Sequence, residues 1–210
     1  MEIQEILTNR KQTEREERVD TILNAARKMF LKKGYLKTTM RGISVESQLS
    51  TGAIYFYFKN KEEIFARIIL ESLELLENIL HRAEIGQESG MKKMRAVMLA
   101  YFHFYSEYNE HYRLLDTFST WKVIMPSETT KKLYERVRPH LAIVESCMRR
   151  YLAEKGIIEK DCWRLTLNLW AGVEGLFSID KMGYLAGEPY SLAELIDQQL
   201  DIFEQGLLRR

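Results

Sequence analysis

Only three prolines interrupt the 210 residues of this chain, which is few for a protein with many strands and turns. Proline fixes one backbone angle and removes a hydrogen-bond donor, so it ends helices and marks turns. Its scarcity favours a mostly helical protein with few breaks. Apolar residues make up 46% of the chain and charged residues 29%, which predicts a soluble chain able to bury a core.

The first helix is expected from Val19, because apolar residues recur from there at intervals of three and four. These residues are Val19, Ile22, Leu23, Ala26, Met29 and Phe30. Two lysines and Gly34 follow, and this suits a helix end, where cations and a left-handed glycine are favoured. Residues 1–15 are polar, and we expect a frayed, flexible arm.

The stretch TGAIYFYF, residues 51–58, allows two interpretations. Its aromatic and branched residues favour a strand, but neither neighbouring segment offers a partner strand. As a helix, it places Ile54 and Phe58 on an inward face and leaves Tyr55 and Tyr57 at or near the surface. We therefore predict a short helix here, and a further helix from about Lys61.

A threonine cap at Thr38 or Thr39, a short helix near residues 40–47, a three-residue turn and this aromatic helix follow one another directly. That order is typical of a helix-turn-helix, whose second helix enters the DNA major groove. Residues 1–61 carry 12 Lys and Arg against 7 Asp and Glu, whereas the remainder carries 19 against 23. A basic N-terminal segment on a mildly acidic body is compatible with a nucleic-acid partner.

Residues 34–65 resemble the N-terminal signature of the TetR family of bacterial transcriptional regulators, and the resemblance extends over residues 16–65. It rests on Gly34-Tyr35, Thr38-Thr39, Ile43, Ser50, Gly52, Ile54-Tyr55, Tyr57-Phe58 and Lys61-Glu62. The resemblance implies an all-α fold, with a three-helix DNA-binding head followed by a helical bundle for ligand binding and dimerisation. It divides the chain into a flexible arm (1–15), a helix-turn-helix domain (16–65, motif about 39–58) and a ligand-binding and dimerisation domain (66–210).

Two residues depart from the family pattern. The family usually has glycine in the turn, where this chain has Gln48, and a positive φ there would cost about 1 kcal/mol. Gly42 sits where a helix former is usual, at a similar cost of about 1 kcal/mol. Both substitutions can loosen the motif, but neither removes its core or its expected DNA contacts.

Eight residues are candidates for DNA binding: Thr39, Ser50, Thr51, Gly52, Tyr55, Phe56, Tyr57 and Lys61. Thr39 is either a cap alone or also part of a phosphate site on free helix amides. Gly52 either weakens its helix or lets the backbone approach DNA closely. The tyrosine rings either pack inward or donate hydroxyl protons to phosphates, and Phe56 can touch a thymine methyl. Lys61 resembles the family lysine that contacts a phosphate.

Beyond the head we expect helices near 61–84, 91–109, 111–124, 127–155, 161–183 and 191–208. The last two carry apolar residues suited either to a monomer core or to association. The resemblance implies a homodimer in which these helices form a four-helix bundle. The candidate interface residues are Leu169, Gly172, Val173, Leu176, Leu195, Leu200 and Phe203.

Residues 98–125 are rich in aromatics, which either fill the core or line an apolar cavity with polar anchors on other helices. In the family such a pocket takes a small molecule that releases the DNA. The candidate ligand residues are Tyr101, His103, Phe104, Tyr105, Tyr108, Phe118, Trp121, Asn168, Trp170 and Glu174. A hydrophobic or aromatic effector is our hypothesis from this stretch.

Other functions have weaker support in the sequence. His103, Glu107 and His111 are spaced four residues apart and could approach a metal, although a helix break near Tyr108 argues against one face. No common catalytic motif is present, so we expect no enzyme and no cofactor. A helical interaction module would not need the residues of the DNA motif.

The compartment is expected from the same sequence. Cys147 and Cys162 are too few for a disulfide framework, and no apolar run is long enough to span a membrane. The sequence therefore predicts a cytoplasmic regulator, associated with the nucleoid when bound to an operator.

Overall fold

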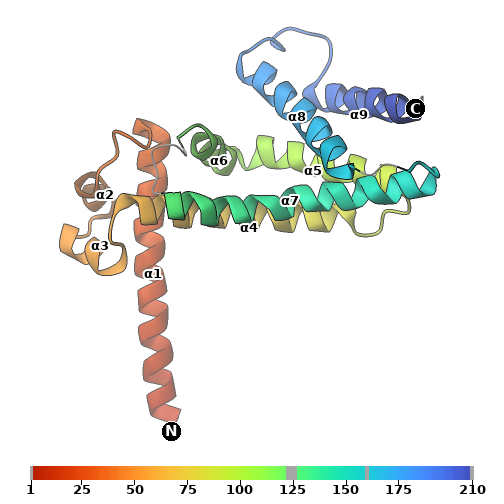
Figure 1. Ribbon diagram of the computed structural model, residues 1–210. Helices are drawn as coiled ribbons and strands as arrows, with labels where there is room; N and C mark the ends of the chain where they lie inside the picture. The colour runs from red at the N-terminus through yellow and green to blue at the C-terminus, as the bar shows by residue number, and fades with distance from the viewer. Residues whose placement is uncertain (1, 122–126, 159–160, 209–210) are drawn as a thin grey trace. The chain divides into compact units, whose positions relative to one another are not determined.

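The computed structural model describes residues 2–121, 127–158 and 161–208. Within these ranges every regular element is a helix, which confirms the all-α prediction (Figure 1). The elements are α1 (Glu2–Lys33), α2 (Met40–Ser47), α3 (Thr51–Tyr57), α4 (Lys61–Glu84), α5 (Gly90–Glu107), α6 (Asn109–Trp121), α7 (Ser127–Glu154), α8 (Cys162–Lys181) and α9 (Leu192–Leu208). No helix in the described part of the chain has both the length and the apolarity needed to cross a membrane.

The first helix is longer than the apolar pattern predicted. It begins at Glu2, so residues expected to fray are helical in the structure. Two polar pairs at the i,i+4 spacing support this stretch: Arg10 with Glu14 at 3.0 Å, and Gln12 with Glu16 at 2.7 Å. Such pairs and helix-favouring side chains can hold a helix that has no apolar side.

The chain divides into two compact units. The first contains residues 1–72 and 110–133, and the second contains residues 73–109 and 134–210. The sequence placed a boundary between residues 65 and 66, whereas this division falls inside α4 and joins most of α6 to the head helices. The functional domains predicted from the sequence remain predictions.

The core of the first unit is formed by the four head helices. Ile22 of α1, Ile43 of α2, Ile54 of α3 and Ile64 of α4 have no exposed surface. Phe65 packs edge-on against Phe30, with ring centroids 5.1 Å apart. These contacts fix the short helices α2 and α3, which have too few residues to be stable alone.

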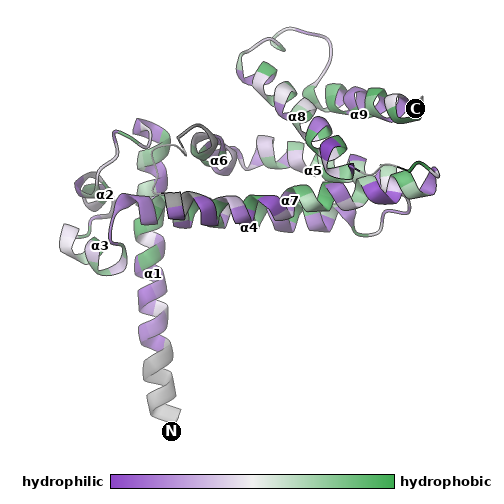
Figure 2. Cartoon of the chain, in the orientation of Figure 1, coloured by the Kyte–Doolittle hydropathy of each residue, from purple (hydrophilic) through white to green (hydrophobic). Residues whose placement is uncertain are grey.

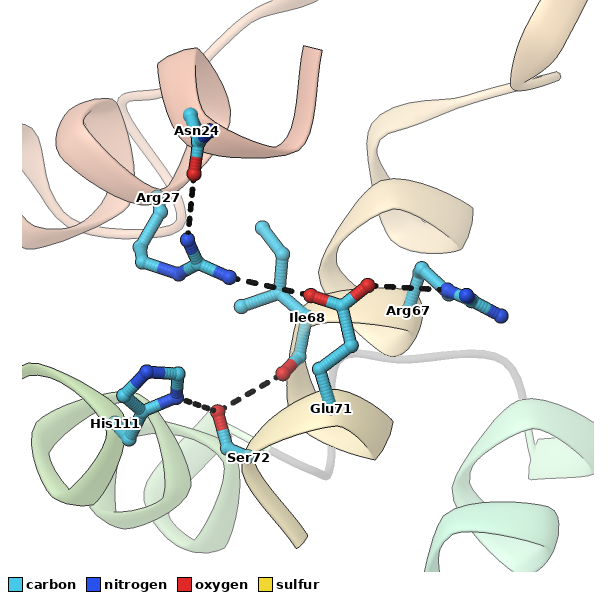
Figure 3. A network of polar contacts seen from close by, with 7 residues as sticks. All are labelled: Asn24, Arg27, Arg67, Ile68, Glu71, Ser72 and His111. Carbon is cyan, nitrogen blue, oxygen red and sulfur yellow. Dashed lines mark hydrogen bonds and ion pairs between the residues drawn. The ribbon is translucent and has the colours of Figure 1, made fainter. Parts of the chain in front are cut away.

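A polar network joins α1, α4 and α6 within this unit (Figure 3). Arg27 forms an ion pair with Glu71 at 3.2 Å, and Arg67 approaches the same carboxylate at 3.2 Å. Ser72 Oγ lies 2.9 Å from the carbonyl of Ile68 and 2.9 Å from His111 Nδ1. Because the single hydroxyl proton goes to the carbonyl, His111 carries a proton on Nδ1 and donates it to Ser72.

The second unit is held by contacts between residues far apart in the sequence. Arg95 of α5 forms ion pairs with Asp197 and, at 2.6 Å, with Asp201 of α9. The backbone amide of Gly90 donates to the carboxylate of Glu154 at 3.0 Å. In Figure 2, green apolar and purple polar residues alternate along α4 and α7, as expected of helices with one buried side.

Candidate nucleic-acid interface

The helix-turn-helix begins at a threonine cap. Thr39 Oγ1 accepts a hydrogen bond from the amide of Gly42 at 3.1 Å, and Thr39 itself is exposed. A Cβ added at Gly42 would lie 2.9 Å from Met29 Cε, so the glycine also lets α2 approach α1. Of the two threonines that could cap α2, Thr38 and Thr39, the structure has Thr39, and its exposed position leaves the start of α2 accessible.

The turn between α2 and α3 is left-handed at Gln48, where φ is 57° and ψ is 26°. Gln48 thus adopts the positive angle whose cost was considered from the sequence. Ser44 stabilises the turn, because its hydroxyl donates to the carbonyl of Leu49 at 2.6 Å. Thr51 Oγ1 lies 3.3 Å from Ser44 Oγ, so this candidate contact residue is half-buried and engaged within the protein.

Helix α3 resolves the two interpretations of the aromatic stretch. Ser50 caps it by accepting from the amide of Ala53 at 3.1 Å, and Ile54 is fully buried. The opposite side is open, with Phe56 78% exposed and Tyr55 52% exposed. Tyr57 is half-buried, and its ring meets the Phe56 ring edge-on at 5.1 Å. The two adjacent exposed rings, Tyr55 and Phe56, make this side of α3 a candidate contact surface.

The surroundings of Gly52 fit a close approach. Gly52 is exposed, and a Cβ built on it would meet only Ser50 Oγ, at 4.0 Å. Nothing inside the protein therefore requires glycine here. The exposed backbone is open to close approach by a partner molecule, and that role of Gly52 stays a prediction.

Lys61 makes a set of contacts that the sequence did not indicate. Its Nζ donates to the carbonyls of Tyr35 and Thr38, both at 3.0 Å, and lies 3.4 Å from that of Leu36. The same group lies 4.5 Å from the centre of the Tyr35 ring. Lys61 therefore holds the connection between α1 and α2, and its expected phosphate contact is untested.

Tyr35 is itself fixed beside this connection. Its hydroxyl donates to Glu62 at 3.0 Å. Burial, and then the nearby Glu62 carboxylate, raise the pKa of Tyr35 well above its ordinary value, so the hydroxyl remains a donor. The partners of both Lys61 and Tyr35 lie more than twenty residues away, which explains why no local sequence signal reveals them.

The expected effector residues fall into several groups. In the second unit Tyr101 stacks on Trp170 with centroids 4.2 Å apart and donates to Glu174. Tyr105 stacks on Phe177 at 4.3 Å and donates to Asp180 at 2.5 Å. Sequence reasoning missed Phe177 and Asp180, whose partners are 72 and 75 residues away by chain number. The rings of α5 and α8 form one aromatic cluster, and both carboxylates beside it belong to α8.

The other expected effector residues have different surroundings. Phe104 is fully buried, and its ring stacks on Tyr108 at 6.1 Å. His103 is exposed and meets Tyr108 edge-on at 5.8 Å. Asn168 is exposed on α8, Phe118 is buried in the first unit, and the side chain of Trp121 lies outside the described residues.

The predicted interface residues need a correction. Leu169, Val173 and Leu200 have no exposed surface, so they pack inside the protomer and leave nothing for a second chain to cover. Gly172 is half-buried and faces α9 within the protomer, since a Cβ there would lie 2.6 Å from Gln199 Nε2. Apolar periodicity identifies the buried side of a helix but not which molecule buries it. Partly exposed candidates remain at Leu176, Leu195 and Phe203.

The outer side of α8 offers a different surface. Leu167 and Ile179 are 42% and 40% exposed, and Ala171 and Gly175 lie between them on the same stripe. A Cβ at Gly175 would meet nothing within 4 Å. An open groove of about 400 Å³ runs between α8 and α9, lined in part by Asn168, Ile202 and Phe203.

The three residues spaced for a metal are separated by the break between α5 and α6. Glu107 ends α5, and His111 follows the start of α6 at Asn109, with Nδ1 committed to Ser72. Across the described residues, no group of three or more His, Cys, Asp or Glu side chains is placed to hold a metal ion.

Two family models match this chain. Residues 22–68 match "Bacterial regulatory proteins, tetR family", and residues 94–203 match "Tetracyclin repressor-like, C-terminal domain". The chain belongs to the tetR family of bacterial regulatory proteins. Its helix-turn-helix, α2 to α3, is the motif expected of a transcription regulator in that family.

Individual relatives agree with this assignment. An uncharacterised regulator of the helix-turn-helix type, YfiR of Bacillus subtilis, is 42% identical over 80 residues, covering 38% of this chain and 32% of that protein. The chain thus spans about a third of the length of the curated relatives it matches.

Solved structures show the same fold. FadR of Bacillus subtilis, in complex with stearoyl-CoA, superposes with a TM-score of 0.71 at 19% identity, over 89% of this chain and 97% of that one. PfmR of Thermus thermophilus, a TetR family transcriptional regulator, gives 0.69 at 23% identity, over 89% and 98%.

Proposed function

We propose that this chain is a ligand-responsive repressor that binds a palindromic DNA operator as a homodimer. The observation that carries the proposal is α3, a capped helix with one side buried through Ile54 and the other open through Tyr55 and Phe56. In the cytoplasm, a two-fold dimer would set two such helices about one DNA turn, roughly 34 Å, apart.

The exposed residues divide into two roles. Tyr55 supplies a hydroxyl that reaches phosphate oxygens, which fix register without reading sequence. Phe56 presents an apolar ring to the base edges, where a thymine methyl is the natural contact. The free amides at the start of α2, next to Thr39, supply a further phosphate site.

For the dimer we propose the outer stripe of α8 (Leu167, Ala171, Gly175, Ile179) together with the α8–α9 groove. Small residues at the middle of this stripe permit close helix approach, and exposed apolar side chains flank it. The partly exposed residues Leu176, Leu195 and Phe203 extend the same surface, and their burial by a second copy would remove apolar area from water.

For the effector we propose a small hydrophobic molecule that enters the aromatic cluster of α5 and α8. Tyr101, Trp170 and Glu174 give it stacking surfaces and one polar anchor. FadR, a structural neighbour with bound stearoyl-CoA, shows that this fold accepts a lipophilic ligand in that protein. The ligand must bind the DNA-free conformation better, by the same factor by which it weakens DNA binding.

The test is fluorescence anisotropy with a duplex from upstream of the chain's own gene, over a series of salt concentrations. Four or five phosphate contacts per subunit give a dimer a log–log salt slope of roughly −7 to −9. Phe56→Ala should reduce the preference over scrambled DNA, whereas Tyr55→Phe should weaken both duplexes alike. A protein that dimerises but binds no duplex from a genome-wide selection is an interaction module, and the proposal then fails.

A further inference from the structure

Helix α1 continues well beyond the core that it helps to form, and its buried side changes character there. Ile22 and Ala26 have no exposed surface. Stepping back from Ile22 by four, three and four residues leads along the same side of the helix to Arg18, Arg15 and Lys11, all exposed. We call these three cations the basic stripe. The side of α1 that is apolar beside the head is therefore basic beyond it.

Acidic residues are concentrated on other sides of this helix segment. Glu16 and Asp20 lie on roughly the opposite side from the basic stripe. Glu14, nearer to the stripe, is paired with Arg10 at 3.0 Å. In contrast, no cation of the stripe has an ion-pair or hydrogen-bond partner among the residues that the structure describes. Three unneutralised charges on one side of a helix favour an anionic partner.

The basic stripe shares a groove with the recognition helix. A groove of about 640 Å³ is lined by the three cations and Thr21 on one side and by Phe56 and Tyr57 of α3 on the other. Glu14 and Glu17 border it. Figure 1 shows α1 extending past α2 and α3 toward the N-terminus, and Figure 2 colours much of this extension purple. The groove thus joins a cationic helix side to the open end of the proposed DNA surface.

We propose that this groove binds the sugar–phosphate backbone of one operator strand, flanking the major groove that α3 enters. The inference rests on the proposed function and deepens it. The stripe spans eight residues, which is seven steps of 1.5 Å or about 10 Å along the helix. This length matches the rise along the DNA axis of roughly three nucleotides of one strand, at 3.4 Å each. The cations neutralise the phosphates of this strand, next to the bases that Phe56 contacts. Phe56 and Tyr57 belong both to α3 and to the lining of the groove, so the groove extends the DNA surface proposed for α3.

Glu17 provides an internal check on the sign of the charge. It borders the groove as an acid, and the carboxylate would face the bound backbone. Removing its charge should therefore tighten DNA binding while removing stripe cations weakens it. A contact that depended on shape alone would not respond to the two changes in opposite directions.

The experiment measures the salt dependence of operator binding by the full chain. A variant with Lys11→Gln, Arg15→Gln and Arg18→Gln should have a log–log slope less steep by roughly 5, since six phosphate contacts of a dimer are lost at about 0.9 each. Arg15→Gln alone should change it by roughly 2, and Glu17→Gln should raise affinity. Lys28→Gln is the matched control, because it removes one positive charge from an exposed position of the same helix, and neither Lys28 nor its partner Glu46 lines the groove.

The outcomes separate the groove from the proposed function. Operator preference retained with a slope unchanged in the triple variant overturns the groove and leaves the proposed function standing. The same loss in Lys28→Gln as in Arg15→Gln also overturns it, since net charge would then explain the effect. If the triple variant loses self-association at unchanged slope, the groove binds a second copy of the chain instead. Absence of DNA binding by the unaltered protein overturns both proposals.

Discussion

The α2–α3 motif and the second unit differ in where their structural partners lie along the chain. Thr39 caps Gly42 and Ser50 caps Ala53, each over three residues. In the second unit, Tyr101 reaches Glu174 over 73 residues and Arg95 reaches Asp197 over 102. A short sequence window therefore contains most of what shapes the recognition motif, whereas the shape of the effector region depends on pairings that no window contains.

The largest expected effect tests this difference through stability. Leu169→Ala removes a side chain with no exposed surface and should lower the free energy of unfolding by about 2–5 kcal/mol. Phe56→Ala, at a 78% exposed position, should change it by less than about 0.5 kcal/mol. Urea denaturation followed by circular dichroism measures both. Equal losses of unfolding free energy in the two variants would mean that Phe56 of α3 contributes to the core as Leu169 of α8 does. The two regions would then not differ in this respect.

Lys61 is the exception within the head, because its partners are distant. Lys61→Met leaves the carbonyls of Tyr35 and Thr38 without their donor, which should cost about 1–3 kcal/mol of stability. Operator affinity should fall because α2 is less well placed, while the salt slope stays constant. A slope less steep by roughly 2 for the dimer would instead show that each Lys61 contacts a phosphate.

Gln48 offers a smaller test of the local rules. Its φ of 57° is a left-handed conformation that glycine adopts without strain. Gln48→Gly should relieve the strain of the left-handed conformation, which would raise the free energy of unfolding by up to about 1 kcal/mol. The greater conformational entropy of glycine in the unfolded chain offsets part of this gain. Thermal melts compare the stability of the variant with that of the unaltered protein. Gln12→Gly is the control, because glycine in a regular helix should lower stability. A loss at Gln48 would mean that its side chain supports the turn.

The smallest effect concerns pH. Burial, and then the charge of Arg27, lower the pKa of His111 below its ordinary 6.5. The unfolded chain then binds this proton at a higher pH than the folded chain, so stability falls as pH drops through about 6.5 and below. His111→Asn keeps a donor for Ser72 without titrating, so it should flatten part of the decline between about pH 7 and pH 5. Urea denaturation at several pH values gives the free energy of unfolding of both proteins. If this free energy falls with pH as steeply in His111→Asn as in the unaltered protein, the assignment is wrong.

Sequence reasoning found the helices because apolar spacing and caps are local properties. It placed Thr39, Ser50 and the left-handed Gln48 for the same reason. It extended the frayed arm too far because helix-forming polar residues, such as Arg10 with Glu14, carry no apolar pattern. It assigned Leu169 and Val173 to a dimer surface because periodicity does not distinguish a core inside one protomer from an interface.

The length of α3 has a consequence for how the protein meets DNA. This helix has seven residues, and Ile54 is its only buried one. Few buried contacts mean low resistance to local opening, so the amides of α3 should exchange with solvent earlier than those of α8. Part of the recognition helix would then be ordered only at the operator, and binding would carry a negative heat-capacity change larger than rigid docking predicts. Operator affinity would therefore depend on the temperature of the cell.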